Sequence, residues 1–357
     1  MNQQEKELFK RLCSYKSEGF DESLLKASSP HVLGQLFFNR MTGVAYGVLQ
    51  QEGLLDKVNR EFRNSLKNAY KINIDRNESY FWCVQNVSNA LSGCEDKYAM
   101  LKGAYLCRYY PIGYRTSNDI DLLVKPKDVT EIGEALLKAG FKQGYIRNER
   151  FEAATRKEII ESKMTKGETV PYIKEINYPS IKYLEVDVNF SLDYKPGETG
   201  IIEEMIKNSR VEEIVELRVR TLRDDDFFIH LCCHLYKEAT TMPWIKNSRD
   251  MTLYKFCDIY TLINDINKDE VNFLYKRAYS VGLEKICAFA IIYTDELFDF
   301  KNKYAVSIAK EILKSDPEFL NVVLSPKDKK KFIYTQKDIF KRFFMDSRLS
   351  LLQEVLN

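Results

Sequence analysis

The sequence of 357 residues predicts an α+β protein, in which a small mixed β-sheet with helices is flanked by an N-terminal and a C-terminal helical region. Length is the first reason, because chains beyond about 250–300 residues usually divide into more than one core. Low glycine and proline content, 15 and 9 residues, is the second, because it favours helices. The third is a change of pattern along the chain. It predicts a helical region at 1–95, a core at 96–222 and a helical domain at 223–357.

Composition excludes several classes of protein. A hydrophobic fraction of 45% is too high for a disordered chain. The formal net charge of +2 argues against a dedicated binder of long nucleic acids, which would usually carry a basic field. The N-terminus has no apolar run of signal-peptide length, and stretches such as 286–293 are too short to span a bilayer. We therefore expect a soluble cytoplasmic protein that does not engage a membrane.

The N-terminal region shows helical spacing of its apolar residues. In 78–91 these are Phe81, Val84, Val87 and Leu91. Asn77 is the expected N-cap of this helix, and Gly93 is expected to end it.

Short alternating runs mark the central core. The segment 183–190 alternates apolar and polar residues, which predicts a half-buried strand. Further strands are expected at 98–101, 120–124 and 170–176. The segment 129–139 predicts an amphipathic helix that ends at Gly140.

Helical patterns return after residue 223. Asp224, Asp225 and Asp226 are expected at a helix start, where carboxylates are favoured, rather than in a metal site. Three more helices are expected at 255–263, 271–279 and 285–297. The basic run 327–331 is expected to begin a solvated helix.

Eight cysteines at irregular spacing indicate reduced, mostly buried thiols. One cluster consists of His230, Cys232, Cys233 and His234. Two histidines four residues apart share a helix face, which is compatible with zinc. No second ligand cluster follows in the sequence, so a buried helix is the favoured interpretation.

Carboxylates in the central core indicate the chemistry. Asp119 and Asp121 are separated by one apolar residue, and residues i and i+2 of a strand point to the same side. Asp187 lies on the polar face of a later strand and would complete the set if the two strands are neighbours. Such carboxylates repel one another unless a cation lies between them, and Mg²⁺ prefers oxygen ligands. The sequence therefore predicts a magnesium site, with manganese as the alternative.

Residues suited to phosphate lie near these carboxylates. Lys102 and Gly103 follow a short strand and precede an expected helix, where backbone amides approach anions. Arg115 lies four residues before Asp119, where a guanidinium can pair with phosphate or hold the loop.

These segments, "LKGAYL…YP…YRTSNDIDLLV" and then "LEVDVNF", resemble a bacterial family of uncharacterised nucleotidyltransferases. That family lies within the DNA polymerase β-like nucleotidyltransferase superfamily. The resemblance covers about 75–265 and includes the later segments "DDDFFIHLCCH" and "LYKFCDIYTLI". Three departures are visible. Ala104 stands where the superfamily has a serine that touches phosphate, and the gap from Gly103 to Asp119 is longer than is usual in the superfamily. Asn189 stands where a histidine is expected.

The resemblance implies a role for each candidate residue. Asp119, Asp121 and Asp187 would bind the metal ions, with Asp187 also accepting a proton. The implied nucleotide-binding residues are Lys102, Gly103, Arg115 and Ser117. The candidate acceptor pocket contains His234, whose helix the family places near the catalytic sheet, with a packed core residue as the alternative. It also contains Lys255 and Asp258, which can pair on one helix face, with a structural ion pair as the alternative.

The expected function is magnesium-dependent transfer of an NMP from an NTP, with ATP as the default donor. The acceptor would be a hydroxyl-bearing small molecule, a peptide or a protein. One alternative is a toxin-like nucleotidyltransferase that acts on tRNA or a host protein. Another is a non-catalytic nucleotide-binding protein of the same fold, which the missing serine after Gly103 would favour.

Overall fold

The computed structural model describes residues 1–192, 199–214 and 217–355. The chain forms two compact units, of which unit 1 combines Met1–Tyr70 with Leu231–Asn357 and unit 2 is the continuous segment Lys71–His230. With 53% helix, 17% strand and a mixed sheet, the α+β prediction is confirmed. These two units group the chain by contacts between residues. The predicted division into three parts, with boundaries after 95 and 222, stays a prediction.

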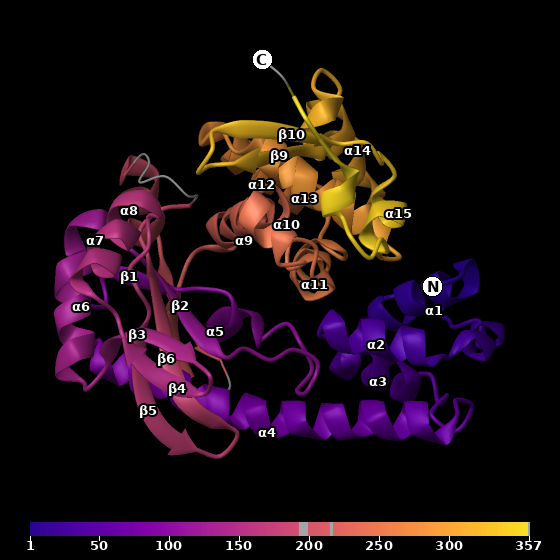
Figure 1. The fold of residues 1–357 in the computed structure, drawn as a ribbon, viewed down its shortest axis with the longest axis horizontal. Helices are drawn as coiled ribbons and strands as arrows, with labels where there is room; N and C mark the ends of the chain where they lie inside the picture. The colour runs from indigo at the N-terminus through magenta and orange to yellow at the C-terminus, as the bar shows by residue number, and fades with distance from the viewer. Residues whose placement is uncertain (193–198, 215–216, 356–357) are drawn as a thin grey trace. The chain divides into compact units, whose positions relative to one another are not determined.

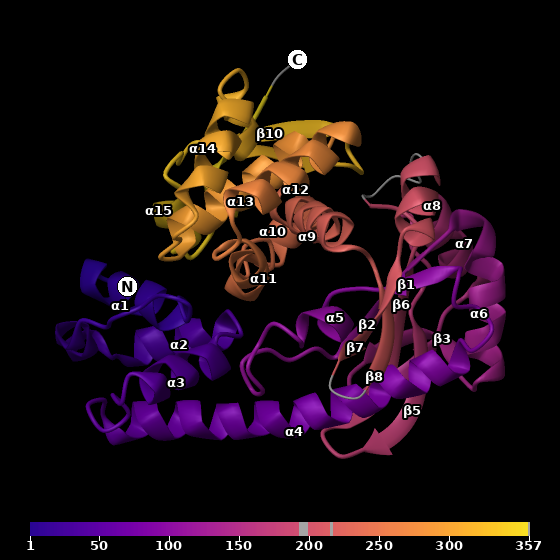
Figure 2. The same cartoon turned by 180° about the vertical axis from the view of Figure 1, so that it is seen from behind.

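Unit 2 contains a mixed sheet, whose eight strands within the described residues follow the order β4-β3-β5-β6-β2-β1-β8-β7 (strands labelled in Figures 1 and 2). All eight lie inside the predicted 96–222 core. They are β1 Tyr98–Met100, β2 Asp119–Val124, β3 Lys142–Arg147, β4 Arg150–Ala153, β5 Tyr172–Tyr178, β6 Ile181–Asn189, β7 Arg210–Ile214 and β8 Leu217–Thr221. β2 pairs in parallel with β6 and antiparallel with β1, so two strands far apart in the sequence become neighbours.

The sheet has one apolar and one polar face at its centre. In β6, Leu184, Val186 and Val188 are buried, and they alternate with polar residues. Helix α6, Val129–Lys138, packs on the apolar side, where its Gly133 leaves room for the ring of Tyr172 on β5. Figures 1 and 2 show α6 on one side of the sheet and the short helix α5, Gly103–Leu106, on the other. The polar face is therefore the one that α5 approaches.

Helix α4 corrects one expectation. It runs from Arg60 to Ala90 and does not begin after Asn77, because no glycine or proline interrupts this segment. Gly93, with φ of 89°, lies in the turn that follows. Two further helices of unit 2 are α7 Arg156–Thr165 and α8 Thr199–Lys207, and α9 Asp224–Ala239 begins at the expected acidic triplet.

Unit 1 is mainly helical. Its N-terminal segment forms α1 Gln3–Cys13, α2 Pro30–Phe38 and α3 Thr42–Gln51. Its C-terminal segment forms α10 Met242–Lys246, α11 Leu253–Ile263, α12 Lys268–Ser280, α13 Glu284–Leu297, α14 Lys303–Ile312 and α15 Ile339–Phe343. Both segments meet in one core, since the side chain of Asn39 accepts a hydrogen bond of 2.9 Å from the backbone of Leu253.

A three-stranded sheet in unit 1 was not expected from the sequence. Its strands are β9 Val322–Ser325, β10 Lys330–Tyr334 and β11 Leu352–Glu354. The prediction of a helix start at 327–331 is therefore wrong: this run forms the β9–β10 turn and enters β10. Lys329 has a positive φ of 55°, and alternation in β10 turns Phe332 and Tyr334 toward a small core that contains Met242.

None of the helices in the described part of the chain combines the length and the apolar character that a bilayer crossing requires. The eight cysteines, all at described positions, are free thiols, and Cys107 is the half-buried one among otherwise buried residues. The cluster at 230–234 lies on α9.

Candidate functional site

Four carboxylates form a patch on the polar face of the central sheet. The parallel register of β2 and β6 places Asp121 opposite Asp187 and Asp119 opposite Glu185. Paired residues of neighbouring strands project to the same face, and so do residues two apart on one strand. The structure thus brings together the three aspartates that the sequence named. Glu185 was missed, although its alternation with Asp187 was the available signal.

Burial and like charge together set the electrostatics of this patch. The side chain of Asp121 is only 4% exposed, and burial, with Asp119 as a further cause, raises its pKa. Burial also raises the pKa of Asp187 well above its ordinary value, and the charges of Asp121 and Asp119 add to this effect. The pKa of Glu185 is raised for the same reasons. The patch therefore favours a cation.

Lys102 supplies a positive charge to the patch. Its Nζ donates to Oδ1 of Asp121 at 2.6 Å, and its side chain is 18% exposed. Burial alone would lower the pKa of Lys102, but the charges of Asp121 and Asp119 outweigh burial and raise it. The backbone places Lys102 beside Asp121. The amide of Leu101, just after β1, donates to the Asp121 carbonyl at 2.9 Å, and Lys102 is the next residue.

The predicted nucleotide-binding residues also meet in the structure. Gly103 packs so tightly that a Cβ there would collide with the side chain of Ser117 and lie 2.8 Å from the hydroxyl of Tyr80. Nη1 of Arg115 donates to Oγ of Ser117 at 2.7 Å. A serine hydroxyl thus lies beside Gly103, although Ala104 follows it in the sequence. It comes from the loop that precedes β2.

Helix α4 holds this loop in place. Asn77, expected as an N-cap, lies inside the helix and binds the loop: its Nδ2 donates to the Arg115 carbonyl at 2.7 Å. Its Oδ1 accepts from the Gly113 amide at 2.8 Å. One turn further on, the hydroxyl of Tyr80 donates to the Asp119 carbonyl at 3.1 Å. Asn77 and Tyr80 are positioning residues that the sequence analysis did not identify.

The helix after Gly103 is shorter than expected. With four residues, α5 offers too little macrodipole to support the expectation that its N-terminus attracts phosphate. Polar contacts fix it instead. The hydroxyl of Tyr105 donates to Asp224 at 2.7 Å, and Nη2 of Arg210 donates to the same carboxylate at 2.7 Å. This network ties α5 to β7 and to the start of α9.

The carboxylate patch suits a metal ion through the type of its donor atoms. Within the described residues, no set of three or more His, Cys, Asp or Glu side chains is arranged as a ready metal site. The carboxylate oxygens of Asp119, Asp121 and Asp187 are nevertheless the ligand type that Mg²⁺ takes. Their neighbour Lys102 already provides one positive charge at Asp121. The residues present therefore fit a hard divalent cation that enters with some rearrangement of side chains.

The candidate acceptor residues lie in unit 1. Glu238, 4% exposed, lies between His234 and Lys255: Nε2 of His234 is 3.1 Å from its Oε1, and Lys255 forms an ion pair with its Oε2. Nζ of Lys255 also lies 5.0 Å from the ring centre of Trp244. Asp258 is buried on the same helix as Lys255. The structure thus joins His234 and Lys255 through Glu238, which the sequence analysis did not name.

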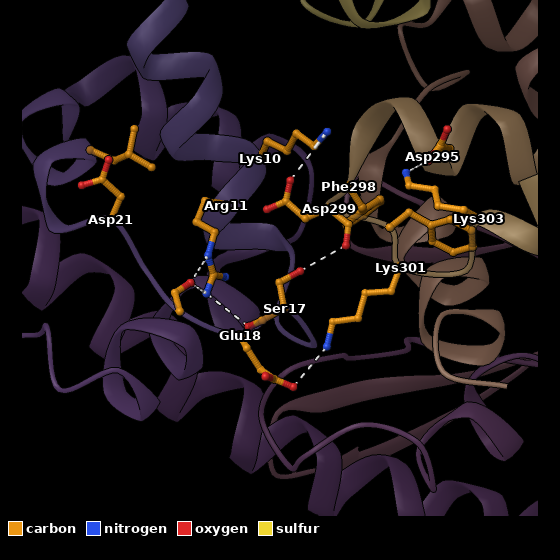
Figure 3. A pocket seen from close by; sticks show the side chains of 13 residues that line it. Lys10, Arg11, Ser17, Glu18, Asp21, Asp295, Phe298, Asp299, Lys301 and Lys303 are labelled. Atoms are coloured by element: carbon orange, nitrogen blue, oxygen red, sulfur yellow. Dashed lines mark hydrogen bonds and ion pairs between the residues drawn. The ribbon is translucent and has the colours of Figure 1, made fainter. Parts of the chain in front are cut away.

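Two hollows of the described surface lie elsewhere. One of about 570 Å³ in unit 1 has four basic and four acidic residues in its lining, and Figure 3 shows several of them paired, such as Lys10 with Asp299 at 3.7 Å. The other, of about 430 Å³ in unit 2, is lined by Trp82 and Leu184 among others. Leu184 alternates with Glu185, so its side chain faces away from the carboxylate patch. Neither hollow contains the candidate catalytic residues.

Comparison with known proteins finds one family model, described as "Uncharacterised nucleotidyltransferase", that matches residues 27–299. The match includes the β2–β6 patch, the loop before β2 and helix α11. A search of curated proteins finds no match.

Proposed function

Since the chain belongs to this uncharacterised nucleotidyltransferase family, we propose that it is a magnesium-dependent enzyme that transfers an NMP from an NTP to an acceptor hydroxyl. One observation carries the proposal: the parallel pairing that sets Asp121 beside Asp187. Two carboxylates on adjacent strands, with a third two residues away, are a costly arrangement unless a cation is bound. The stability of the fold gives no reason for so many like charges on one half-buried face of the sheet.

The carboxylates would act as ligands and as a proton acceptor. Asp119, Asp121 and Asp187 would hold Mg²⁺ or Mn²⁺, which when bound supplies positive charge for the reacting phosphate and the departing pyrophosphate. Asp187 would accept the proton of the attacking hydroxyl. Transfer of this kind depends on positioning and charge stabilisation, so a small number of side chains is sufficient.

The loop residues would bind the triphosphate. Lys102 and Arg115 bring positive charge, and the hydroxyl of Ser117 is a hydrogen-bond donor beside Gly103. In this proposal Ser117 replaces the hydroxyl that Ala104 lacks. Asn77 and Tyr80 would keep the loop in register with β2.

ATP remains the proposed donor, and a small molecule, peptide or protein the proposed acceptor. His234, Lys255 and Asp258 are the residues we propose for acceptor recognition. The buried Glu238 between His234 and Lys255 supports a fixed orientation of the imidazole. The net charge of +2 supports an acceptor other than a long nucleic acid, with tRNA as the exception to be tested.

The test is label transfer from each α-labelled NTP in the presence of Mg²⁺ and a lysate of the source. The double variant Asp119→Asn with Asp121→Asn should lose at least about 100-fold in transfer and in pyrophosphate release, because the metal ligands are removed. Asp96→Asn, an exposed aspartate of the same unit, is the matched control and should retain activity.

Two results would contradict the proposal. Full turnover by the double variant, shown to be folded by circular dichroism, would exclude these carboxylates from the chemistry. Metal-dependent NTP binding by the wild type without transfer to any acceptor would favour the non-catalytic alternative.

A further inference from the structure

The position of Lys102 within the carboxylate patch has a consequence for how ligands enter the site. Its ammonium group lies 2.6 Å from Asp121, and both side chains are largely shielded from water, with 18% and 4% exposure. The charges of Asp121, Asp119 and Asp187 all act on this ammonium. In this structure, Lys102 therefore supplies a positive charge that partly neutralises the carboxylate patch.

The backbone at Lys102 is held in an unfavourable conformation. Its φ of 42° and ψ of −115° lie outside the regions that non-glycine residues prefer. Hydrogen bonds hold it there, because its carbonyl accepts from the Leu106 amide at 2.7 Å and the preceding Leu101 amide pairs with β2. Such strain persists only where the surroundings impose it, and here the result is an ammonium aimed at Asp121.

The neighbourhood of Lys102 offers a second partner for its charge. Gly103 follows directly, and the hydroxyl of Ser117 and the guanidinium of Arg115 lie beside that glycine. These are the residues proposed to bind the triphosphate. A lysine side chain is a flexible stem of four carbons, so its ammonium can exchange a carboxylate for a nearby phosphate while the backbone stays in place.

We propose that Lys102 holds the cation position of the patch until a metal–triphosphate complex arrives, and that its ammonium then moves from Asp121 to a phosphate oxygen. This inference rests on the proposed function. It adds that the metal ion and the nucleotide bind together and not one after the other. It also accounts for the lack of a ready metal site in the described residues, because Asp121 is engaged by the lysine.

The test uses Mn²⁺ as the probe, measured by electron paramagnetic resonance or calorimetry on the full chain. Lys102→Met should bind Mn²⁺ alone at least tenfold more tightly than the wild type, because the competing ammonium is gone. It should bind the Mn²⁺ complex of a non-hydrolysable ATP analogue at least tenfold more weakly, because a phosphate contact is lost. Opposite signs in one variant are what the loss of one positive charge that serves both Asp121 and the phosphate predicts.

Lys97→Met is the matched control. Lys97 lies just before β1, is 22% exposed and forms an ion pair with Glu131, so the variant removes a similar lysine–carboxylate pair away from the patch. Both affinities should remain those of the wild type. If Lys102→Met does not fold, Lys102→Gln carries the same expectation, because its polar amide also lacks the positive charge.

The outcomes separate this inference from the proposed function. Equal Mn²⁺ affinity in the wild type and in Lys102→Met, with nucleotide-dependent metal binding in both, overturns the role of Lys102 and leaves the nucleotidyltransferase proposal standing. A change of both affinities in the same direction also overturns it, since it indicates an altered site rather than the loss of a charge that serves both partners. If Mn²⁺ binds neither protein, with or without nucleotide, the metal site itself is wrong and both proposals fail.

Discussion

At the scale of single residues, the absence of a side chain at Gly103 determines how the loop before β2 approaches the carboxylate patch. The position has no room for a methyl group, because the side chain of Ser117 and the hydroxyl of Tyr80 occupy that space. Tyr80 in turn donates to the Asp119 carbonyl. A change at Gly103 should therefore displace Ser117 and the start of β2 together.

Gly103→Ala should lower the free energy of unfolding by about 1–3 kcal/mol, as for other overpacked sites. Urea denaturation monitored by circular dichroism measures this loss. Gly103→Ala combined with Ser117→Gly removes the collision with Ser117 and leaves the close contact with the Tyr80 hydroxyl, so it should restore part of the stability. Equal stability of Gly103→Ala and the wild type would show that the contact between Gly103 and Ser117 is looser than described.

Residues related by local spacing could be predicted from the sequence. Asp119 and Asp121 share a face by the period of a strand, and Asp187 follows the same rule on its own strand. Asn77 and Tyr80 could not be assigned, because their partners lie 38 and 39 residues away and helical periodicity does not reveal side-chain partners at that distance.

At the scale of elements, one carboxylate connects three pieces of secondary structure. Asp224 at the start of α9 accepts from Tyr105 on α5 and from Arg210 on β7. Arg108 adds to this network, with its guanidinium 5.5 Å from the ring centre of Tyr105 and an ion pair of 2.9 Å to Glu212. A four-residue helix such as α5 would not persist without tertiary contacts of this kind.

The network predicts a pH dependence of stability. Partial burial by itself raises the pKa of Asp224, but the hydrogen bonds from Tyr105 and Arg210 outweigh it, so the pKa lies below its ordinary value. A lowered pKa in the folded state stabilises the fold above the unfolded pKa of about 4, and this contribution is lost as the pH falls through the folded value. Chemical denaturation between pH 2 and pH 7 should show it.

The test compares the wild type with the variant Asp224→Asn. Its free energy of unfolding should be lower than that of the wild type near pH 7, and the two should converge toward pH 2. Glu213→Gln, at an exposed position of β7, is the control and should show no such convergence. A constant difference across the range would mean that Asp224 acts through packing rather than charge.

Elements with strong periodicity were predicted, and those without it were missed. β1, β2, β5 and β6 and helix α6 are found close to their expected positions. β8 was missed although it alternates, with Leu217, Val219 and Thr221 on one side and arginines between them. The β9–β10 hairpin was missed because a lysine-rich run resembles a solvated helix until the positive φ of Lys329 is known.

At the scale of the whole molecule, the two units differ in how the chain builds them. Unit 2 is continuous, whereas unit 1 needs segments from both ends of the sequence. Polar contacts join these segments: Tyr15 donates to Thr261 at 3.0 Å, and Lys16 pairs with Asp265 at 2.9 Å. Composition and local patterns do not show such a return of the chain, because the contacts that define it are more than 200 residues apart.

This organisation predicts how fragments behave. A fragment of residues 71–230 should fold alone and unfold in one cooperative transition, because it keeps the complete mixed sheet. A fragment of residues 1–70 should remain largely unfolded, and mixing it with 231–357 should restore helical signal. Thermal unfolding by circular dichroism tests both, and an unfolded 71–230 fragment would show that the sheet depends on unit 1.

The return of the chain also bears on biosynthesis. Because 160 residues separate the two segments of unit 1, its N-terminal helices leave the ribosome long before their partners exist. At about 5–20 residues per second, roughly 8–30 seconds pass before the C-terminal segment of unit 1 begins to follow, and the sheet with its aspartates can form in that interval. Exposed core residues of α1, such as Leu8 and Leu12, are then candidates for chaperone binding, and slower translation would lengthen their exposure.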